Sequence, residues 1–178
     1  MTMFILWLSL LLHPHSYERM VDRVSASVIR VTNVEGSCSG FVIAPHRVLT
    51  ANHCLGENLR ADGKPVDKII KKDDFYDLLL LDVPTVKAPL QFEDAPVVRF
   101  EKLTAIGYGF GWTKLTVVRV TAMLVDQVPA EGIPPGIITQ VEYIGGQSGG
   151  PLFDTEGRIY GMQFATNHLH LGSKRRRS

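Results

Sequence analysis

Short apolar runs separated by turn residues make up most of the chain. The runs are rich in Val, Ile and Leu, and Gly, Pro or an Asp-Gly pair stands between them. In the first half we expect strands at residues 24–34, 40–44, 47–51, 68–70 and 78–83. A second set is expected at residues 103–106, 115–125, 137–143, 151–153 and 158–164.

This pattern predicts an all-β fold. No stretch shows a sustained helical period with caps, apart from the two ends, and many short strands without intervening helices favour antiparallel barrels or sandwiches. The two sets of strands divide near residues 88–98, and neither an internal repeat nor a low-complexity linker separates them. We therefore expect two halves that pack together.

Composition places the chain among compact globular proteins. It has 178 residues, of which 45% are hydrophobic, and 19 Lys and Arg against 18 Asp and Glu. Four of the basic residues lie in the last five positions, so the rest of the chain carries net negative charge. Nucleic-acid binding is not expected except through the basic tail at residues 169–178, which otherwise reads as a solvated chain end.

The N-terminus carries an apolar run at residues 4–12 (FILWLSLLL). The run is shorter than the roughly 20 residues of a membrane span, but it suits the hydrophobic part of a secretory signal. Neither a preceding basic residue nor a clear cleavage site accompanies it. Two readings stay open: export or membrane tethering, giving a secreted, periplasmic or membrane-tethered protein, and an apolar extension packed on the domain.

Residues 37–55 (SCSGFVIAPHRVLTANHCL) contain the first candidate for chemistry, His53, directly before Cys54. A lone His is usually structural or exposed, but its context here is specific. The string Leu-Thr-Ala-Asn-His-Cys resembles the Leu-Thr-Ala-Ala-His-Cys around the general base of trypsin-like serine proteases. This resemblance implies a disulfide between Cys54 and Cys38, the two cysteines of the chain.

Residues 144–154 (IGGQSGGPLFD) contain the second candidate, Ser148. A nucleophilic serine needs a tight turn rich in Gly, in which neighbouring N–H groups can point at an oxyanion. The string Gly-x-Ser-Gly-Gly-Pro-Leu resembles the nucleophile loop of the same family. The resemblance implies an oxyanion hole formed by the N–H groups of Gly146 and Ser148.

A carboxylate must orient the imidazole, and residues 71–83 offer Asp73, Asp74, Asp77 and Asp82. Asp77 directly precedes an apolar run, which resembles the family pattern after its triad Asp. Asp82 is the alternative, and it requires a shifted strand register. The order His53, Asp77, Ser148 is that of trypsin. The α/β-hydrolases also have a Gly-x-Ser-x-Gly motif, but their Asp and His follow the serine.

The resemblance covers residues 24–166 and is nearest to compact proteases of the HtrA/Deg kind. It implies two perpendicular six-stranded-type antiparallel β-barrels with the triad between them, and we expect no PDZ module. We therefore expect three parts along the chain: an apolar segment at 1–20, a protease domain at 21–168, and the basic tail at 169–178. Within the protease domain the two barrels are expected at about 21–95 and 96–168.

The implied function is a serine endopeptidase acting on polypeptides, without a metal or other cofactor. The family pattern places Phe164, Ala165 and Thr166 on the edge strand that pairs with substrate, and Glu142 at the base of the specificity pocket. For both residues a structural alternative stays open: Phe164 as a buried side chain at the end of a core strand, and Glu142 as an exposed side chain at a strand end. The pair His168 and His170 is a weak metal signal and reads as surface. The alternative function is a catalytically silent, protease-like binding module.

The residue before the nucleophile is Gln147. In digestive relatives an Asp at this place pairs with an N-terminus released by cleavage, which a neutral amide cannot do. We therefore expect residues 145–148 to be ordered by local hydrogen bonds, and the chain to be active without N-terminal processing.

Overall fold

The computed structural model describes residues 16–92, 96–111, 113–127, 136–139 and 144–164. One helix and two short 3₁₀ turns accompany the strands in this part of the chain. The elements are α2 (Ser16–Ser25), β1 (Val28–Thr32), β2 (Ser37–Ala44), β3 (Arg47–Ala51), η1 (Asn52–Cys54), β4 (Arg60–Ala61), β5 (Lys64–Pro65), β6 (Lys68–Asp73), β7 (Leu78–Asp82), β8 (Lys102–Gly107), η2 (Gly109–Gly111), β9 (Thr116–Gln127), β10 (Gly136–Thr139), β11 (Pro151–Phe153) and β12 (Ile159–Met162).

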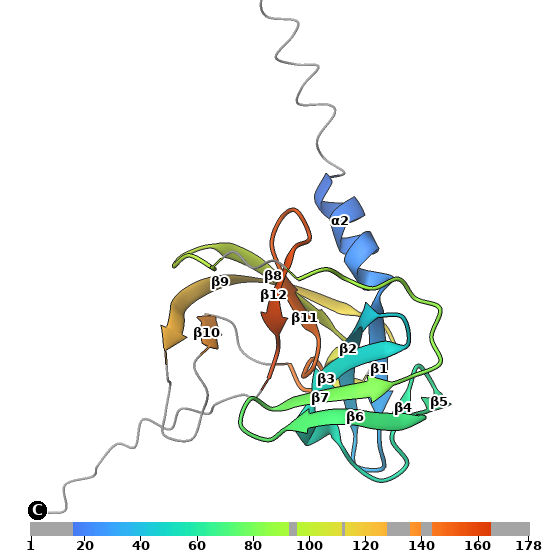
Figure 1. The fold of residues 1–178 in the computed structure, drawn as a ribbon. Helices are drawn as coiled ribbons and strands as arrows, with labels where there is room; N and C mark the ends of the chain where they lie inside the picture. Colours follow the sequence, from blue (N-terminus) through green and yellow to red (C-terminus); the bar gives the residue numbers. More distant parts are fainter. Residues whose placement is uncertain (1–15, 93–95, 112, 128–135, 140–143, 165–178) are drawn as a thin grey trace, which may run out of the picture.

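The strands form two antiparallel sheets, which lie side by side in Figure 1. The first has seven strands in the order β5-β4-β1-β2-β3-β7-β6, and the second has five in the order β10-β9-β8-β11-β12. The predicted all-β class is confirmed. The division between the sheets falls between β7 and β8, which brackets the predicted 88–98 segment.

One strand prediction was wrong at its start. Residues 24–34 were expected to be extended throughout, but the helix α2 runs to Ser25 and β1 begins at Val28. Met20 and Val24 lie four positions apart and are the buried residues of this helix, while Glu18, Asp22 and Arg23 are exposed. This amphipathic spacing favours a helix, although Val24 taken alone favours a strand.

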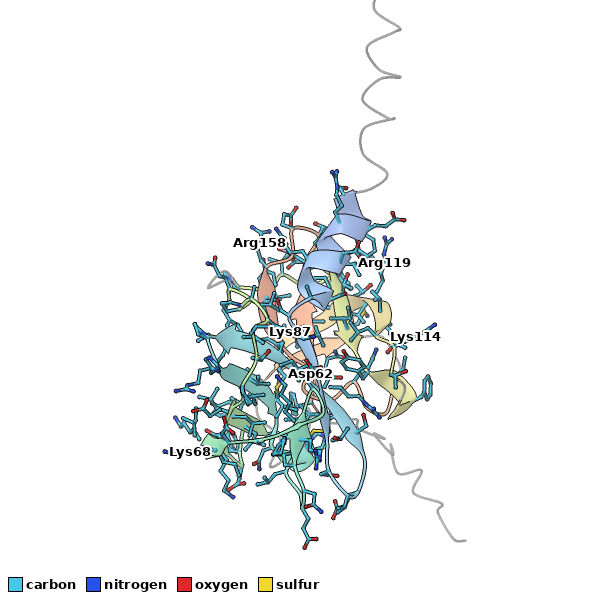
Figure 2. All side chains as sticks on the ribbon, turned by 90° about the vertical axis from the view of Figure 1, so that its right-hand side faces the viewer. Asp62, Lys68, Lys87, Lys114, Arg119 and Arg158 are labelled. Carbon is cyan, nitrogen blue, oxygen red and sulfur yellow. A yellow bond between two sulfur atoms is a disulfide. The ribbon has the colours of Figure 1, made fainter. Side chains whose placement is uncertain are left out.

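Helix α2 packs where the two sheets meet (Figure 1). Its buried side chains join a cluster that draws on both sheets, namely Met20, Val24, Val28, Phe41, Ile106, Phe153 and Ile159. The Tyr17 hydroxyl lies 3.3 Å from Thr104 Oγ1, and the Arg119 guanidinium stacks 3.9 Å from the Tyr17 ring centroid. Figure 2 shows α2 between the labelled Arg119 and Arg158.

The sequence boundary expected at residue 20 lies inside this packed helix. Arg23 donates a hydrogen bond to the carbonyl oxygen of Glu156, in the turn between β11 and β12. Across the described residues, α2 included, we find no helix with the length and apolar character needed to cross a bilayer.

Each sheet also has a core of its own, built from alternating positions of its strands. In β7, Leu79 and Leu81 are fully buried and their neighbours are half-buried, as expected for a strand with one face toward the core. The first core contains Ile29, Val31, Val42, Val48, Ala61, Leu79, Leu81 and Val83. The second contains Val97, Leu103, Ala105, Val120, Ala122 and Leu152.

We predict that Met20→Ala lowers the free energy of unfolding by roughly 2–5 kcal/mol, because it removes a buried side chain from the cluster between the sheets. Asp22→Ala, an exposed change on the same helix, is the control and should shift it by less than about 0.5 kcal/mol. Urea denaturation measures both. Equal stability of the two variants would mean that α2 does not contribute to the core.

Candidate active site

Strand pairing brings His53 and Asp77 together. His53 lies in η1 directly after β3, and Asp77 directly precedes β7, which pairs with β3 so that Ala51 faces Leu78. His53 Nδ1 lies 2.6 Å from Asp77 Oδ2, and the His53 backbone N–H donates to Asp77 Oδ1 at 2.8 Å. The carboxylate thus fixes both the ring and the backbone of His53, and Nε2 is the ring nitrogen that faces away from it.

The other three carboxylates of this region have different partners. Asp82 forms an ion pair with Arg47 at 2.8 Å, in the β3–β7 register that the sheet adopts. Asp73 accepts the backbone N–H groups of Phe75 and Tyr76 and so caps a turn. Asp74 accepts hydrogen bonds from Asn52 and Lys72. Among the four candidates, Asp77 is the one that contacts His53.

Asp77 holds this position in a left-handed backbone conformation, with φ of 53°. Such a conformation costs a residue with a Cβ on the order of 1–2 kcal/mol. The Asn52 backbone N–H, which donates to the Asp77 carbonyl oxygen at 2.9 Å, helps to hold it. This conformation directs the carboxylate back toward η1, directly after the turn at residues 73–76.

The loop that contains Ser148 makes two turns that require glycine. Gly146 and Gly149 have φ of 95° and 84°, which a residue with a Cβ rarely adopts. At Gly149 a methyl group would also collide with the Ser39 carbonyl oxygen and approach the Ala51 nitrogen. The loop therefore packs directly against β2 and against Ala51, the last residue of β3. Ala51 lies two residues before His53.

Buried hydrogen bonds from Ser39 tie the loop to the first sheet. The Ser39 backbone N–H donates to the Ser148 carbonyl oxygen at 2.7 Å, and its hydroxyl donates to the Gly146 carbonyl oxygen at 2.7 Å. The same hydroxyl accepts the Tyr108 N–H, also at 2.7 Å. Ser39 is fully buried, and its role was not foreseen from the sequence, where it reads as one polar residue in a strand.

Gln147 is buried and ties the loop to the second sheet. Its Nε2 donates to Thr116 Oγ1 at 2.9 Å, and that hydroxyl in turn donates to the Gly107 carbonyl oxygen. The Gln147 N–H donates to the Ile144 carbonyl oxygen at 3.1 Å. Hydrogen bonds within the domain thus hold residues 145–148. The bond of Gln147 to Ile144 is local, as expected, but the bonds to Ser39 and Thr116 join residues distant in sequence.

A disulfide joins Cys38 on β2 to Cys54 in η1. This bond connects the strand that receives the Ser148 loop to the turn that contains His53. Cys38, His53 and Cys54 form the one group of possible metal ligands within the described ranges. Both sulfur atoms belong to the disulfide, so this group offers no thiolate.

A comparison with protein families matches residues 38–162 to the model described as "Trypsin-like peptidase domain". The chain belongs to this family. Its matched region contains η1, the Asp77 turn and the Ser148 loop.

The curated relatives of the chain include bacterial proteins named as serine proteases. "Serine protease Rv3671c" of Mycobacterium tuberculosis is 29% identical over 164 residues, covering 82% of this chain and 41% of the relative. A "Probable periplasmic serine endoprotease DegP-like" of Pseudomonas fulva is 32% identical over 136 residues, covering 70% and 28%. The crystal structure of the inactive form of Rv3671c protease superposes with a TM-score of 0.68 at 26% identity, covering 84% and 83%. The chain thus spans less than half the length of these curated relatives.

Of the residues expected to contact substrate in this family, Phe164 is the one that the structure describes. It is half-buried and follows Gln163, whose carbonyl oxygen accepts the Gly149 N–H at 2.7 Å. The Gln163 N–H donates to the Gly150 carbonyl oxygen at 2.8 Å, so the chain after β12 lies beside the Ser148 loop. Outside the described residues lie Glu142, Ala165, Thr166, His168, His170, the apolar run 4–12 and the tail 169–178.

We predict that Gly149→Ala destabilises the protein by roughly 1–3 kcal/mol or more, because the added methyl group meets the backbone of β2 in a left-handed conformation. Gly161→Ala in β12 is the matched control, since a Cβ there has nothing within 4 Å. Thermal unfolding followed by circular dichroism measures both. Equal melting temperatures would contradict the close docking of the loop.

Proposed function

We propose that the protein is a serine endopeptidase that cleaves polypeptides through an acyl-enzyme, with His53, Asp77 and Ser148 as its triad. The observation that carries the proposal is the double hydrogen bond from His53 to the Asp77 carboxylate. The Ser148 loop lies on the same pair of strands that presents His53. Membership of the trypsin-like family and the names of the relatives agree with this chemistry.

In the proposed mechanism Ser148 attacks the scissile carbonyl carbon while His53 Nε2 removes its proton. His53 then gives this proton to the leaving amine, and water repeats the cycle to release the acyl group. Asp77 holds the ring so that Nε2 faces the reacting atoms, and it stabilises the imidazolium. The negative oxygen would be bound by the N–H groups of Gly146 and Ser148, with one such donor contributing about 3–4 kcal/mol in comparable enzymes.

We further propose that the segment beginning at Phe164 pairs with the substrate backbone as an added antiparallel strand, continuing through Ala165 and Thr166. The hydrogen bonds of Gln163 to the Ser148 loop support this, because they hold the start of the segment beside the nucleophile. Glu142 at the base of the specificity pocket would favour a basic residue before the cleaved bond.

For location, we propose an extracytoplasmic or membrane-associated protein. The DegP-like relatives are named periplasmic, and disulfides such as Cys38–Cys54 persist in oxidising compartments. In this view the apolar run 4–12 directs export or tethering, α2 belongs to the protease domain, and the tail 169–178 is solvated. The two halves of that domain would correspond to the two sheets.

We predict that Ser148→Ala lowers kcat for a fluorogenic peptide by about 10⁴-fold or more, because it removes the nucleophile and leaves the backbone unchanged. Ser25→Ala is the control: its hydroxyl bonds to the Val21 carbonyl oxygen within α2, far from the loop in sequence, and kcat should stay within about twofold. Cleavage by the Ser148 variant at the wild-type rate would overturn the triad assignment.

We also predict that activity needs no new N-terminus. Gln147 is neutral and already bound to Thr116, so a released ammonium group has no charged partner next to Ser148. The 178-residue chain with an acetylated N-terminus and a version beginning at Ser16, the first residue of α2, should have kcat/KM values within about twofold. Activity that appears only after trimming would point to a zymogen.

A further inference from the structure

Asn52, directly before His53, binds both ends of the short segment that leads into Asp77. Its side-chain Nδ2 donates to Asp74 Oδ1 at 2.8 Å, and its backbone N–H donates to the Asp77 carbonyl oxygen at 2.9 Å. Its own carbonyl oxygen accepts the Leu55 N–H at 2.9 Å, which closes η1. One residue therefore connects the turn containing His53 to residues 74–77 at two points.

The segment from Asp73 to Asp77 needs such a restraint. It is a turn outside the regular sheet, with its N-terminal part closed by the Asp73 carboxylate and its end at the left-handed Asp77. The Phe75 and Tyr76 side chains in its middle are about half exposed, so core packing does little to hold it. Hydrogen bonds to η1 therefore add to the pairing of β3 with β7 in keeping the Asp77 carboxylate next to His53.

The amide orientation that lets Asn52 donate to Asp74 leaves the amide oxygen without a hydrogen bond within the described part of the chain. Its Oδ1 is buried and finds no hydrogen-bond donor among the described residues. Turning the amide over would bring Oδ1 against the Asp74 carboxylate, where two acceptors repel each other. An alanine would avoid the unpaired buried oxygen but would lose the hydrogen bond to Asp74.

Asp74 is suited to be the anchor of this contact. Its carboxylate is largely exposed and accepts hydrogen bonds from Lys72 Nζ at 3.2 Å as well as from Asn52. These two contacts, that of Lys72 first, lower the pKa of Asp74 below its ordinary value. The carboxylate is therefore a charged acceptor at neutral pH, and the amide hydrogen bond to it is charge-assisted.

We propose that Asn52 is a positioning residue, which by binding Asp74 and Asp77 together holds the Asp77 carboxylate in line with the His53 ring. This inference rests on the proposed peptidase function, since the alignment matters when His53 moves a proton. In this role Asn52 acts through Asp77.

The kinetic test compares Asn52→Ala and Asp74→Ala with their double variant, using a fluorogenic peptide that the wild type cleaves. Each single change should lower kcat by about tenfold with KM within about twofold, because misplaced catalytic groups reduce turnover. The double variant should be no worse than either single one, since both remove the same contact. Asp74→Asn keeps an oxygen acceptor for Asn52 and should recover most of kcat.

Lys72→Ala is the matched control, because it removes the other partner of Asp74 and leaves the Asn52 contact in place. Its kcat should stay within about twofold of the wild type. Melting temperatures of all variants separate positioning from unfolding, and that of Asn52→Ala should stay within a few degrees. A wild-type kcat in Asn52→Ala, or additive losses in the double variant, would overturn the inference.

A measurement without substrate keeps this inference distinct from the proposed function. His53 Nδ1 and Asp77 Oδ2 are 2.6 Å apart, and we expect the proton of such a short, charge-assisted hydrogen bond to give a proton NMR signal downfield of ordinary amides. The signal should be sharp in wild type and Lys72→Ala, and broadened or lost in Asn52→Ala. If the wild type shows the signal but cleaves no peptide, the peptidase proposal fails. An unchanged signal in Asn52→Ala would sink the positioning role.

Discussion

The buried hydrogen bonds between Ser39 and the Ser148 loop are the interaction on which the rest of the site depends. Ser39 lies in the first sheet, while the loop belongs to the second, and the contact spans 107 positions in sequence. Because Ser39 is fully buried, its donors and acceptors must be satisfied, and they are satisfied only when the two sheets dock in one register. A correctly docked pair of sheets therefore places the Ser148 loop beside η1.

The loop can make this close contact because most of its residues are glycines, which have no side chain. Gly149 lies against the Ser39 carbonyl oxygen, and Gly146 against that of Tyr108, at distances that exclude a Cβ. The Asp77 turn supplies the carboxylate for His53 in a strained backbone conformation. The site is thus assembled from two irregular segments, each held by a regular strand pair, a common arrangement in which rigid sheets position functional loops.

Much of this could be predicted from contiguous strings. His53 and Ser148 lie in motifs whose residue types indicate their proposed roles. The apolar run after Asp77 distinguishes it from the other aspartates of that segment. Three features escaped prediction because their partners are remote: Ser39 with Gly146, Gln147 with Thr116, and Asn52 with Asp74, 107, 31 and 22 positions apart. Helix α2 escaped because β-branched residues near its end resemble the strand that follows.

We propose that the docked Ser148 loop presents an activated serine. Treatment of the protein with a fluorophosphonate, followed by mass spectrometry of the adduct, tests this. We expect a single adduct on the peptide that contains Ser148, with no labelling after heat denaturation, because only a serine next to an oriented histidine reacts. An unlabelled native protein, or an adduct on another serine, would contradict it and favour a catalytically silent binding module.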